Sequence, residues 1–498
     1  MGHIESLPSS ATRKPDDAAL VAALRNVLPH AAVLTETEAR RPYESDGLSA
    51  YRQQPQVVVL PANEAEVQAV LQVCHRLGVA VVARGHGTGL SGGAMPNERG
   101  VLMSLARLNR ILEIDAHART ARVQPGVRNL AISEAVAPQG LYYAPDPSSQ
   151  IACSIGGNVA ENSGGVHCLK YGLTVHNLVK VRALLIDGTV IEVGADEPDA
   201  AGFDLLALLT GSEGLLAVVT EVTVRLLPRP RTVQALLASF DDVERAGQAV
   251  ANIIAAGIIP AGLEMMDGPA TRAAEAFVHA NYPVDAEALL ICESDGTAEE
   301  VADETARMRA VLEAAGATEV RFSRDEAERL KFWAGRKAAF PAVGRLAPDY
   351  YCIDGTIPRR TLGSVLNWMY ARAEALGVQV VNVFHAGDGN LHPLLLFDAA
   401  KAGDFARTEV LANEILAKCV EVGGTITGEH GVGVEKIDAM CVQFNAAELG
   451  IFLGVKAAFD PDGLMNPGKA VPVLHRCAEL GRMHVHHGAL PHPDLPRF

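Results

Sequence analysis

The chain has 498 residues, of which 49% are hydrophobic and 20% charged, and its formal net charge is −16. This length predicts two or three domains, and the composition excludes a disordered or fibrous protein. The negative charge argues against binding to nucleic acid or to an anionic membrane surface. An acidic protein that handles an anionic substrate needs local positive charge in its site, from arginine, lysine or a metal ion.

The eight cysteines are scattered, and none forms a C-x-x-C pair. This spacing argues against iron–sulfur clusters and zinc ribbons on this chain, and it is typical of reduced, cytosolic thiols. The N-terminus has no basic start followed by an apolar stretch, and the apolar segment 249–266 is broken by a proline and two glycines. We therefore expect a cytoplasmic protein with no membrane span of its own, whose contact with the inner face of the membrane goes through partners.

The first half of the chain divides into two segments. Residues 1–55 are expected to form an N-terminal helical lead-in, with a helix that opens at Asp16 or Asp17. Residues 56–229 alternate short apolar runs with turn residues, and the Pro228–Pro230 segment ends this pattern. Asn63 and Gly78 delimit a predicted helix over 63–77. The strands predicted here are 57–60, 79–83, 101–105, 111–115, 120–123, 179–185 and 189–193.

The second half is predicted to contain a cap domain over 230–425 and a C-terminal segment over 426–475. A tail rich in histidine and proline follows over 476–498. Alternating helices and strands predict an α+β layer with helices covering one face of a sheet. The predicted helices are 241–256, 297–315, 323–340, 359–376 and 404–422, and the predicted strands are 288–293, 350–356, 378–385 and 391–397.

A glycine-rich loop follows the predicted strand 79–83. Gly87, Gly89 and Gly92 match the spacing of the dinucleotide fingerprint, but a strand follows them where a Rossmann fold needs a helix. Glycines still let backbone N–H groups surround a phosphate oxygen. On this loop alone, phosphate binding competes with a long turn.

Two further segments are dense in turn residues. One runs from Pro145 through Ser149 to Gly165, and the other is Thr210–Gly214, which leads into an apolar strand. Three such loops within 130 residues of one apolar domain predict that an extended cofactor passes between them.

Taken together, the segments Arg84–Gly92, Pro145–Ser149, Ile155–Asn158, Gly211–Gly214 and Asn466–Lys469 resemble the FAD-linked oxidases of the vanillyl-alcohol-oxidase and p-cresol-methylhydroxylase type. The similarity covers about residues 40–498. It is strongest to the family that holds the FAD-binding subunit of glycolate oxidase and D-lactate dehydrogenase. It implies a two-subdomain FAD-binding domain, an α+β cap with an antiparallel sheet, and a C-terminal segment that returns to the flavin.

The resemblance also implies which residues contact FAD. Some relatives hold the flavin covalently through a histidine, a role open to His86, but we expect non-covalent FAD with His86 forming a hydrogen bond. The implied contacts are Gly85, Gly87, Thr88, Gly89, Ser91, Pro145, Ser149, Gly156, Gly157, Asn158, Ser163, Gly164, Gly165, Gly211, Glu213, Gly214 and Asn466.

Two apolar runs flank Asp388-Gly389, a two-residue hairpin signal. A turn centred there pairs His385 with His392 on one face of a hairpin, close enough for both imidazoles to bind one divalent cation. Glu429 offers a third ligand from a second glycine-bracketed loop. Two histidines and one carboxylate form a catalytic type of metal site, which suits zinc, manganese, iron or cobalt. The alternative is a pair of core histidines that are merely hydrogen-bonded.

Ser323 and Glu326 form a capping box that opens a predicted helix, and Trp333, Arg336 and Phe340 share one face of it. An arginine between aromatic side chains suits a carboxylate clamp, although a solvated surface arginine is the plainer reading. The resemblance implies that Arg336 holds the substrate carboxylate. Relatives that act on 2-hydroxy diacids carry a lysine where this chain has Cys352, which favours a small monoacid.

These residues give a mechanistic hypothesis for oxidation of a 2-hydroxy acid such as glycolate or D-lactate. The metal polarises the C2 hydroxyl, His430 removes its proton as the general base, and hydride passes from C2 to FAD. The resemblance implies an iron–sulfur electron-transfer subunit and a second FAD-fold subunit as partners. Two alternatives stay open, namely another flavin-dependent alcohol oxidase of the same fold and a non-catalytic FAD-binding accessory subunit.

Overall fold

The computed structural model describes residues 17–196 and 201–472. The first sheet has the order β1-β2-β4-β3, and its last three strands are parallel. Strand β1 pairs antiparallel with β2, so the lead-in contributes a strand as well as helices. Asn63 caps α3, and Gly78 ends it in the left-handed conformation, as predicted. The elements are α1 (Asp17–Arg25), β1 (Val33–Leu34), α2 (Thr37–Arg40), β2 (Val57–Val59), α3 (Glu64–Leu77), β3 (Ala80–Arg84) and β4 (Gly100–Ser104).

The second sheet is antiparallel, with the order β5-β6-β10-β8-β9. Residues 155–161, which the turn-rich sequence suggested to be loop, form helix α5 with Ser154 as its N-cap. The hydroxyl of Ser154 accepts a hydrogen bond from Gly157, which offsets the poor helix propensity of the two glycines. The elements are β5 (Ile111–Asp115), β6 (Thr120–Val123), α4 (Asn129–Val136), β7 (Leu141–Tyr142), α5 (Ile155–Glu161), α6 (Cys168–Tyr171), β8 (Leu178–Leu184), β9 (Val190–Gly194), α7 (Leu205–Leu209), β10 (Val218–Arg225) and β11 (Leu227–Pro228).

The cap is one seven-stranded antiparallel sheet, with the order β15-β12-β14-β13-β18-β20-β16. Its strands are β12 (Thr232–Phe240), β13 (Gly262–Asp267), β14 (Ala288–Gly296), β15 (Glu319–Phe322), β16 (Asp349–Cys352), β18 (Gln379–Phe384) and β20 (Pro393–Phe397), and a short pair, β17 (Gly355–Thr356) with β19 (Asn390–Leu391), lies beside it. The cap helices are α8 (Val243–Ala255), α9 (Gly268–Val278), α10 (Ala298–Ala314), α11 (Glu326–Lys337), α12 (Ala339–Val343), α13 (Leu362–Leu376) and α14 (Asp404–Glu421).

Helices cover both faces of the cap sheet, so the expectation of one covered face is wrong. Along β12, Leu236 packs into one core with α8, α10 and α13, whereas the neighbouring Leu237 packs into a second core with α9, α11 and α12. Both alternating faces of the strand are apolar, which is the pattern of a sheet buried on two sides.

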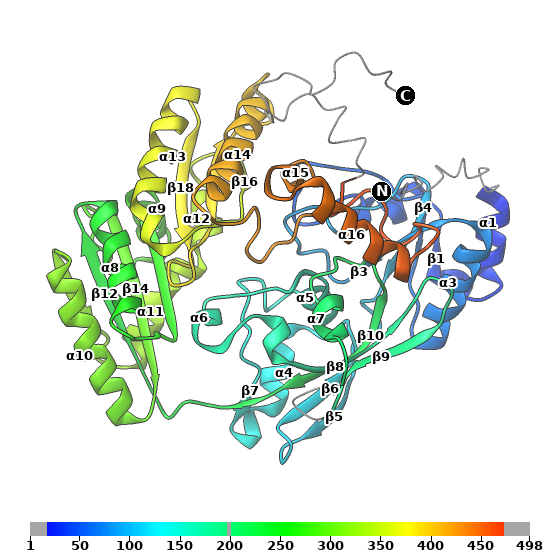
Figure 1. Cartoon of the computed structure of the whole chain (residues 1–498), viewed down its shortest axis with the longest axis horizontal. Helices are drawn as coiled ribbons and strands as arrows, with labels where there is room; N and C mark the ends of the chain where they lie inside the picture. Colours follow the sequence, from blue (N-terminus) through cyan, green and yellow to red (C-terminus); the bar gives the residue numbers. More distant parts are fainter. Residues whose placement is uncertain (1–16, 197–200, 473–498) are drawn as a thin grey trace.

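The C-terminal segment passes from the cap back to the first domain through α15 (Met440–Gln443) and α16 (Ala446–Phe459), drawn in orange in Figure 1. It ends beside β3, where the backbone N–H of Asn466 donates to the carbonyl of Val81. The predicted α+β class, the antiparallel cap sheet and the returning C-terminal segment are confirmed. The predicted tail over 476–498 lies outside the described residues.

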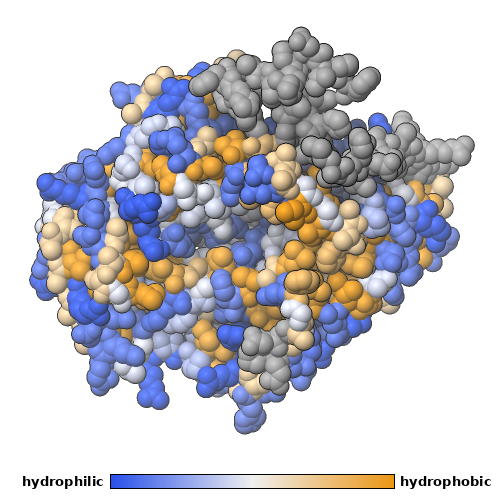
Figure 2. Space-filling model, viewed as in Figure 1, coloured by the Kyte–Doolittle hydropathy of each residue, from blue (hydrophilic) through white to orange (hydrophobic). Residues whose placement is uncertain are grey.

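The surface and the cysteines add two observations. Apolar side chains reach the surface on α16, where Ile451 is 67% and Phe452 is 37% exposed (Figure 2). No helix among residues 17–196 and 201–472 is long and apolar enough to cross a membrane. Six cysteines among the described residues are buried free thiols.

Candidate active site

The hairpin that carries the two predicted metal-binding histidines joins β18 to β20. Its loop has four residues, 386–389, and His385 stands opposite Asn390, so the predicted two-residue turn with His385 opposite His392 is wrong. The observed register differs from the predicted one by two residues. A shift of two leaves each side chain on its original face of the sheet. The two imidazoles therefore still lie together, with ring centroids 5.0 Å apart and planes at 86°.

Glu429 completes this group from the loop that follows Thr427. Its Oε1 lies 3.2 Å from Nε2 of His385 and 3.0 Å from Nε2 of His392. The three ligand atoms lie within 4.8 Å of one another. Nδ1 of His392 is buried without a hydrogen bond among the described residues, and Nε2 of the same ring faces the Glu429 carboxylate, where it can bind a cation together with that oxygen. Two imidazoles and one carboxylate thus fit a divalent metal with an open position.

The charges in this group are strongly coupled. Burial alone raises the pKa of Glu429, but the charges of His385 and His392 outweigh it and hold that pKa well below its usual range. Burial alone lowers the pKa of His385, but the carboxylates of Glu264 and Glu429 outweigh it and hold that pKa well above its usual value. The pocket is therefore built for a positive charge between these side chains.

Glu264, on strand β13, links this group to the predicted carboxylate clamp. It is 1% exposed, and its two oxygens accept from Nδ1 of His385 at 2.7 Å and from Nε of Arg336 at 2.6 Å. A carboxylate on the far nitrogen of a metal-binding histidine fixes the orientation of the ring. Of the three guanidinium nitrogens of Arg336, Nε alone makes a hydrogen bond to a described residue. The two terminal nitrogens are therefore left for a substrate carboxylate.

Helix α11, which carries Arg336, differs from the prediction at both ends. Its N-cap is Asp325, whereas Ser323 pairs with the backbone of Ala235 as a continuation of the sheet. The helix ends at Lys337, so Phe340 belongs to α12 and packs edge-on against Tyr350. The predicted shared face with Phe340 is therefore wrong, because the helix breaks between the two positions.

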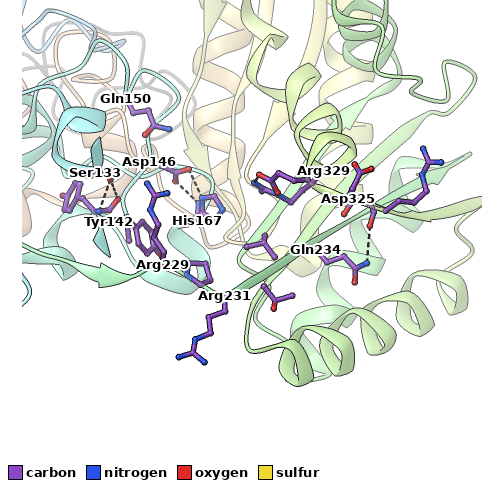
Figure 3. Close-up of a pocket in the computed structure, with 18 residues that line it drawn as sticks. Ser133, Tyr142, Asp146, Gln150, His167, Arg229, Arg231, Gln234, Asp325 and Arg329 are labelled. Atoms are coloured by element: carbon purple, nitrogen blue, oxygen red, sulfur yellow. Dashed lines mark hydrogen bonds and ion pairs between the residues drawn. The ribbon is translucent and has the colours of Figure 1, made fainter. Parts of the chain in front are cut away.

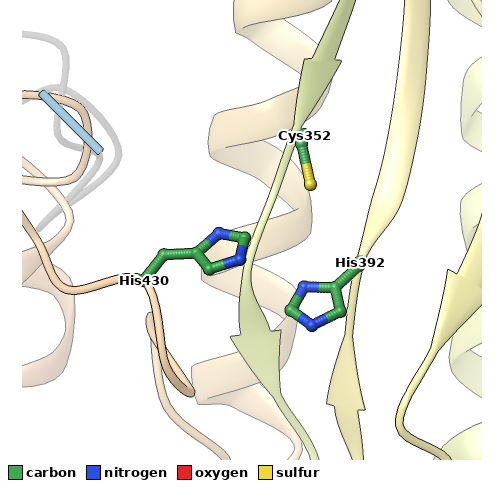
Figure 4. Close-up of side chains that lie close together, drawn as sticks. All are labelled: Cys352, His392 and His430. Atoms are coloured by element: carbon green, nitrogen blue, oxygen red, sulfur yellow. The ribbon is translucent and has the colours of Figure 1, made fainter. Parts of the chain in front are cut away.

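His430 lies beside the two histidines, on the same loop as Glu429. Its ring stacks on His392 with centroids 4.8 Å apart and planes at 12°, and its Nδ1 makes no hydrogen bond. Burial lowers the pKa of His430 to about 4, so the ring is neutral at physiological pH. Figure 4 shows the Cys352 thiol on β16 above the His392 and His430 rings.

The predicted flavin loops converge on a cavity between the two N-terminal sheets. Of the predicted contacts, Gly85, Gly156, Gly157, Glu213 and Gly214 line it, and Arg84 and Glu161 line it as well. A Cβ atom at Gly85 would lie 2.2 Å from Oγ of Ser154, so a larger residue there would displace the hydroxyl that caps α5. Backbone N–H groups beside an arginine fit the phosphates of a dinucleotide cofactor.

Three of the predicted FAD contacts also make hydrogen bonds within the protein. Ser91 donates to the carbonyl of His430, Asn466 donates to the carbonyls of Gly93 and Glu213, and Glu213 accepts from two backbone N–H groups of the C-terminal segment. The other predicted contacts, which lie in the same loops or beside them, are Gly87, Thr88, Gly89, Pro145, Ser149, Asn158, Ser163, Gly164, Gly165 and Gly211.

Gly164 and Gly165 allow close contacts with other segments of the chain. His86, the residue open to covalent attachment of flavin, forms a hydrogen bond within the protein. A Cβ atom at Gly164 would lie 2.5 Å from Oε2 of Glu429, and one at Gly165 would meet the backbone of Asp146. Nδ1 of His86 lies 2.5 Å from the carbonyl oxygen of Ala152. Gly164 therefore allows a predicted flavin loop to approach the predicted metal ligand.

A separate cleft of about 800 Å³ lies between the FAD-binding half and the cap, beside the crossover Arg229–Thr232 (Figure 3). His167 lies at its edge with Nδ1 2.7 Å from Asp146 and Nε2 3.2 Å from Glu293 of the cap. These carboxylates outweigh burial and raise the pKa of His167 well above its usual value. The cleft thus adjoins a charged contact that ties the two halves together.

Sequence reasoning missed Glu264 and Lys436. The only sequence signal for Glu264 is one charged residue in the apolar run Gly262–Met266, and Lys436 follows an ordinary turn. A carboxylate inside an apolar strand marks a residue that needs a buried partner, which could have identified Glu264.

Comparison with known proteins agrees with this architecture. Residues 55–194 match the model of the FAD binding domain, and residues 229–470 match that of the C-terminal domain of FAD linked oxidases. The chain is 63% identical to glycolate oxidase subunit GlcD of Escherichia coli K12 over 97% of both proteins. It is 32% identical to D-lactate dehydrogenase of Anaerostipes hadrus over 88% of this chain and 94% of that protein.

Solved structures support the same fold at low sequence identity. p-Cresol methylhydroxylase matches with a TM-score of 0.76 and 16% identity, covering 91% of this chain and 96% of that one. The two family models cover both domains of the chain. The structural match covers 91% of the chain and so includes the way in which the two domains are arranged. The chain therefore belongs to the family of FAD-linked oxidases that includes glycolate oxidase subunit GlcD and D-lactate dehydrogenase.

Proposed function

We propose that this protein is an FAD-dependent dehydrogenase that oxidises a small 2-hydroxy acid, either glycolate to glyoxylate or D-lactate to pyruvate. The observation that carries this proposal is the convergence of Arg336, His430 and the group His385, His392 and Glu429 on one buried site. The names of two relatives, a glycolate oxidase subunit and a D-lactate dehydrogenase, support this class of substrate.

Each side chain has a role that its surroundings permit. The free terminal nitrogens of Arg336 hold the substrate carboxylate, while Glu264 keeps the guanidinium in place. The unpaired Nδ1 of neutral His430 receives the proton of the C2 hydroxyl. The glycine-rich loops would hold FAD, which would supply the hydride acceptor, and His385, His392 and Glu429 would hold a divalent metal, which would supply Lewis acidity toward the C2 oxygen. Loss of one proton and one hydride converts the alcohol to a carbonyl.

The site favours a monoacid over a diacid. Cys352 lies beside His392 and His430, and the family resemblance implies a lysine at this position in enzymes that act on 2-hydroxy diacids. Burial raises the pKa of the Cys352 thiol well above its usual value, so this side chain is neutral and offers no charge to a second carboxylate.

We further propose that this chain is the catalytic subunit of a glycolate oxidase complex. Electrons from the reduced flavin then pass to an iron–sulfur partner, and a second FAD-fold subunit completes the assembly. The protein would work in the cytoplasm and reach the inner face of the membrane through these partners. Support comes from the name of the relative, which is a subunit, and from the lack of any C-x-x-C pair on this chain.

The decisive experiment records the visible spectrum of the purified protein while hydroxy acids are added under anaerobic conditions. Glycolate, D-lactate, L-lactate and D-2-hydroxyglutarate are each tested with and without EDTA. Bleaching of the flavin band by a small monoacid, lost with EDTA and restored by zinc, manganese or cobalt, is the expected result. A yellow protein that no hydroxy acid bleaches, even with added metal, would overturn the proposal in favour of an accessory subunit.

A further inference from the structure

The loop that carries Glu429 and His430 is held by two buried carboxylates from different parts of the fold. Asp354, in the link between β16 and β17 of the cap, accepts from the backbone N–H groups of Gly428 and His430 at 3.0 and 2.9 Å, and from that of Glu429 at 3.2 Å. Glu213, from the FAD-binding half, accepts from Val432 and Gly433 at 2.7 and 2.6 Å.

Asp354 has further partners that keep it ionised. The hydroxyl of Thr427 donates to it at 2.6 Å, and Nζ of Lys436 lies 3.1 Å away. Both Asp354 and Lys436 have fully buried side chains. Burial alone raises the pKa of Asp354, but the charge of Lys436 and the hydrogen bond from Thr427 oppose it, and that pKa lies well below its usual range.

The loop has little freedom between these two anchors. Gly431 has a φ of 79°, and a Cβ atom there would lie 2.1 Å from Oε2 of Glu161. Gly433 has a φ of 52°, and a Cβ atom there would lie 2.1 Å from the carbonyl oxygen of Ser91. The chain needs glycine at both positions to pass between the carboxylates and the first domain.

We infer that Asp354 and Glu213 are positioning residues that set where Glu429 and His430 stand relative to the cap and the flavin loops. This inference rests on the proposed function for the roles of Glu429 and His430. Neither carboxylate needs to touch substrate, because each acts through the backbone amides it accepts. Replacing Asp354 by asparagine keeps the volume but removes the charge that faces Lys436 and leaves one acceptor oxygen where the carboxylate has two, so the anchoring of the loop is weakened.

The test compares Asp354→Asn with Asp267→Asn in the FAD-loaded full chain. Asp267 is a suitable control, because it is a fully buried cap carboxylate that also accepts from backbone N–H groups, those of Ala270 and Asn382. Thr427→Val is a milder second variant, because it leaves the Asp354 carboxylate in place and removes one hydroxyl, which donates to Asp354 and also contacts the Gly431 carbonyl and Lys436. Zinc affinity is measured by competition with a chromophoric chelator, and amide hydrogen exchange is followed over 428–433.

We expect Asp354→Asn to lower zinc affinity about 10- to 100-fold and to speed exchange of the 428–430 amides, with Thr427→Val weaker in the same direction. Asp267→Asn should leave both quantities near the wild-type values, because Asp267 makes no contact with the loop. Unchanged exchange in Asp354→Asn, or an equal loss of loop protection in Asp267→Asn, would overturn the inference. Hydrogen exchange needs neither metal nor turnover, so this result stands apart from any failure of the proposed function.

Discussion

The Oε1 atom of Glu264 lies 2.7 Å from Nδ1 of His385, and both side chains are at most 5% exposed. The same carboxylate holds Arg336, and their charges outweigh burial to keep the pKa of Glu264 below its usual value. One strand residue thereby connects the predicted substrate clamp to the predicted metal ligands.

Glu264→Gln tests this connection. An amide cannot accept from both partners as the carboxylate does, so we expect metal affinity to fall about 10- to 100-fold and the affinity for oxalate to fall with it. Chelator competition gives the first quantity, and perturbation of the flavin spectrum by oxalate gives the second. A variant that loses only one of the two affinities would show that the shared carboxylate does not couple the groups.

Arg336→Met should raise the KM for the 2-hydroxy acid about 10- to 100-fold, because a charged hydrogen-bond donor to the carboxylate is lost. Flavin content should stay the same. Arg329→Met is a matched control on the same helix, where the guanidinium instead pairs with Glu293 and Glu326. Steady-state kinetics on both variants measure the effect, and an equal rise in KM for the control would assign it to general disruption of α11.

Gly433→Ala should destabilise the protein by about 1–3 kcal/mol, because alanine is strained in the left-handed backbone conformation and its Cβ atom would clash with the carbonyl oxygen of Ser91. It should also weaken metal binding by displacing Glu429. Gly454→Ala provides the opposite control, because nothing lies within 4 Å of a Cβ atom at that helical position. There we expect a gain of about 0.5–1 kcal/mol. Denaturant unfolding and chelator competition measure both variants.

The contribution of Asp267 to the stability of the fold depends on pH, and the direction of that dependence follows from its raised pKa. Burial raises its pKa from 3.8 to about 6, against hydrogen bonds from Ala270, Asn382 and Tyr370. The folded state therefore binds this proton more tightly than the unfolded chain, and stability due to Asp267 increases as the pH falls from about 7 to about 4. Relative to Asp267→Asn, the wild type should gain up to about 3 kcal/mol over that range. Denaturant unfolding of both proteins at several pH values measures the difference, and a pH-independent difference would contradict it.

The local signals in the sequence predicted much of this fold. Caps such as Asn63 and Gly78 act within one turn, so α3 was placed correctly. The hairpin register was wrong by two residues because the loop length depends on tertiary contacts, yet the period of two kept both histidines on one face. Glu264 and Asp354 escaped prediction as structural anchors because their partners are 72 or more residues away and no motif joins them. The capping box at Ser323 failed because sheet pairing competed for the same side chain.

Glu213 lines the cavity where the predicted flavin loops meet and also holds the backbone that carries Glu429 and His430. One side chain thus takes part in two equilibria, and thermodynamic linkage requires them to influence each other equally. Whatever factor flavin adds to the affinity for metal, metal must add to the affinity for flavin. The factor by which chelation changes the dissociation constant for flavin should therefore equal the factor by which removal of flavin changes the dissociation constant for metal.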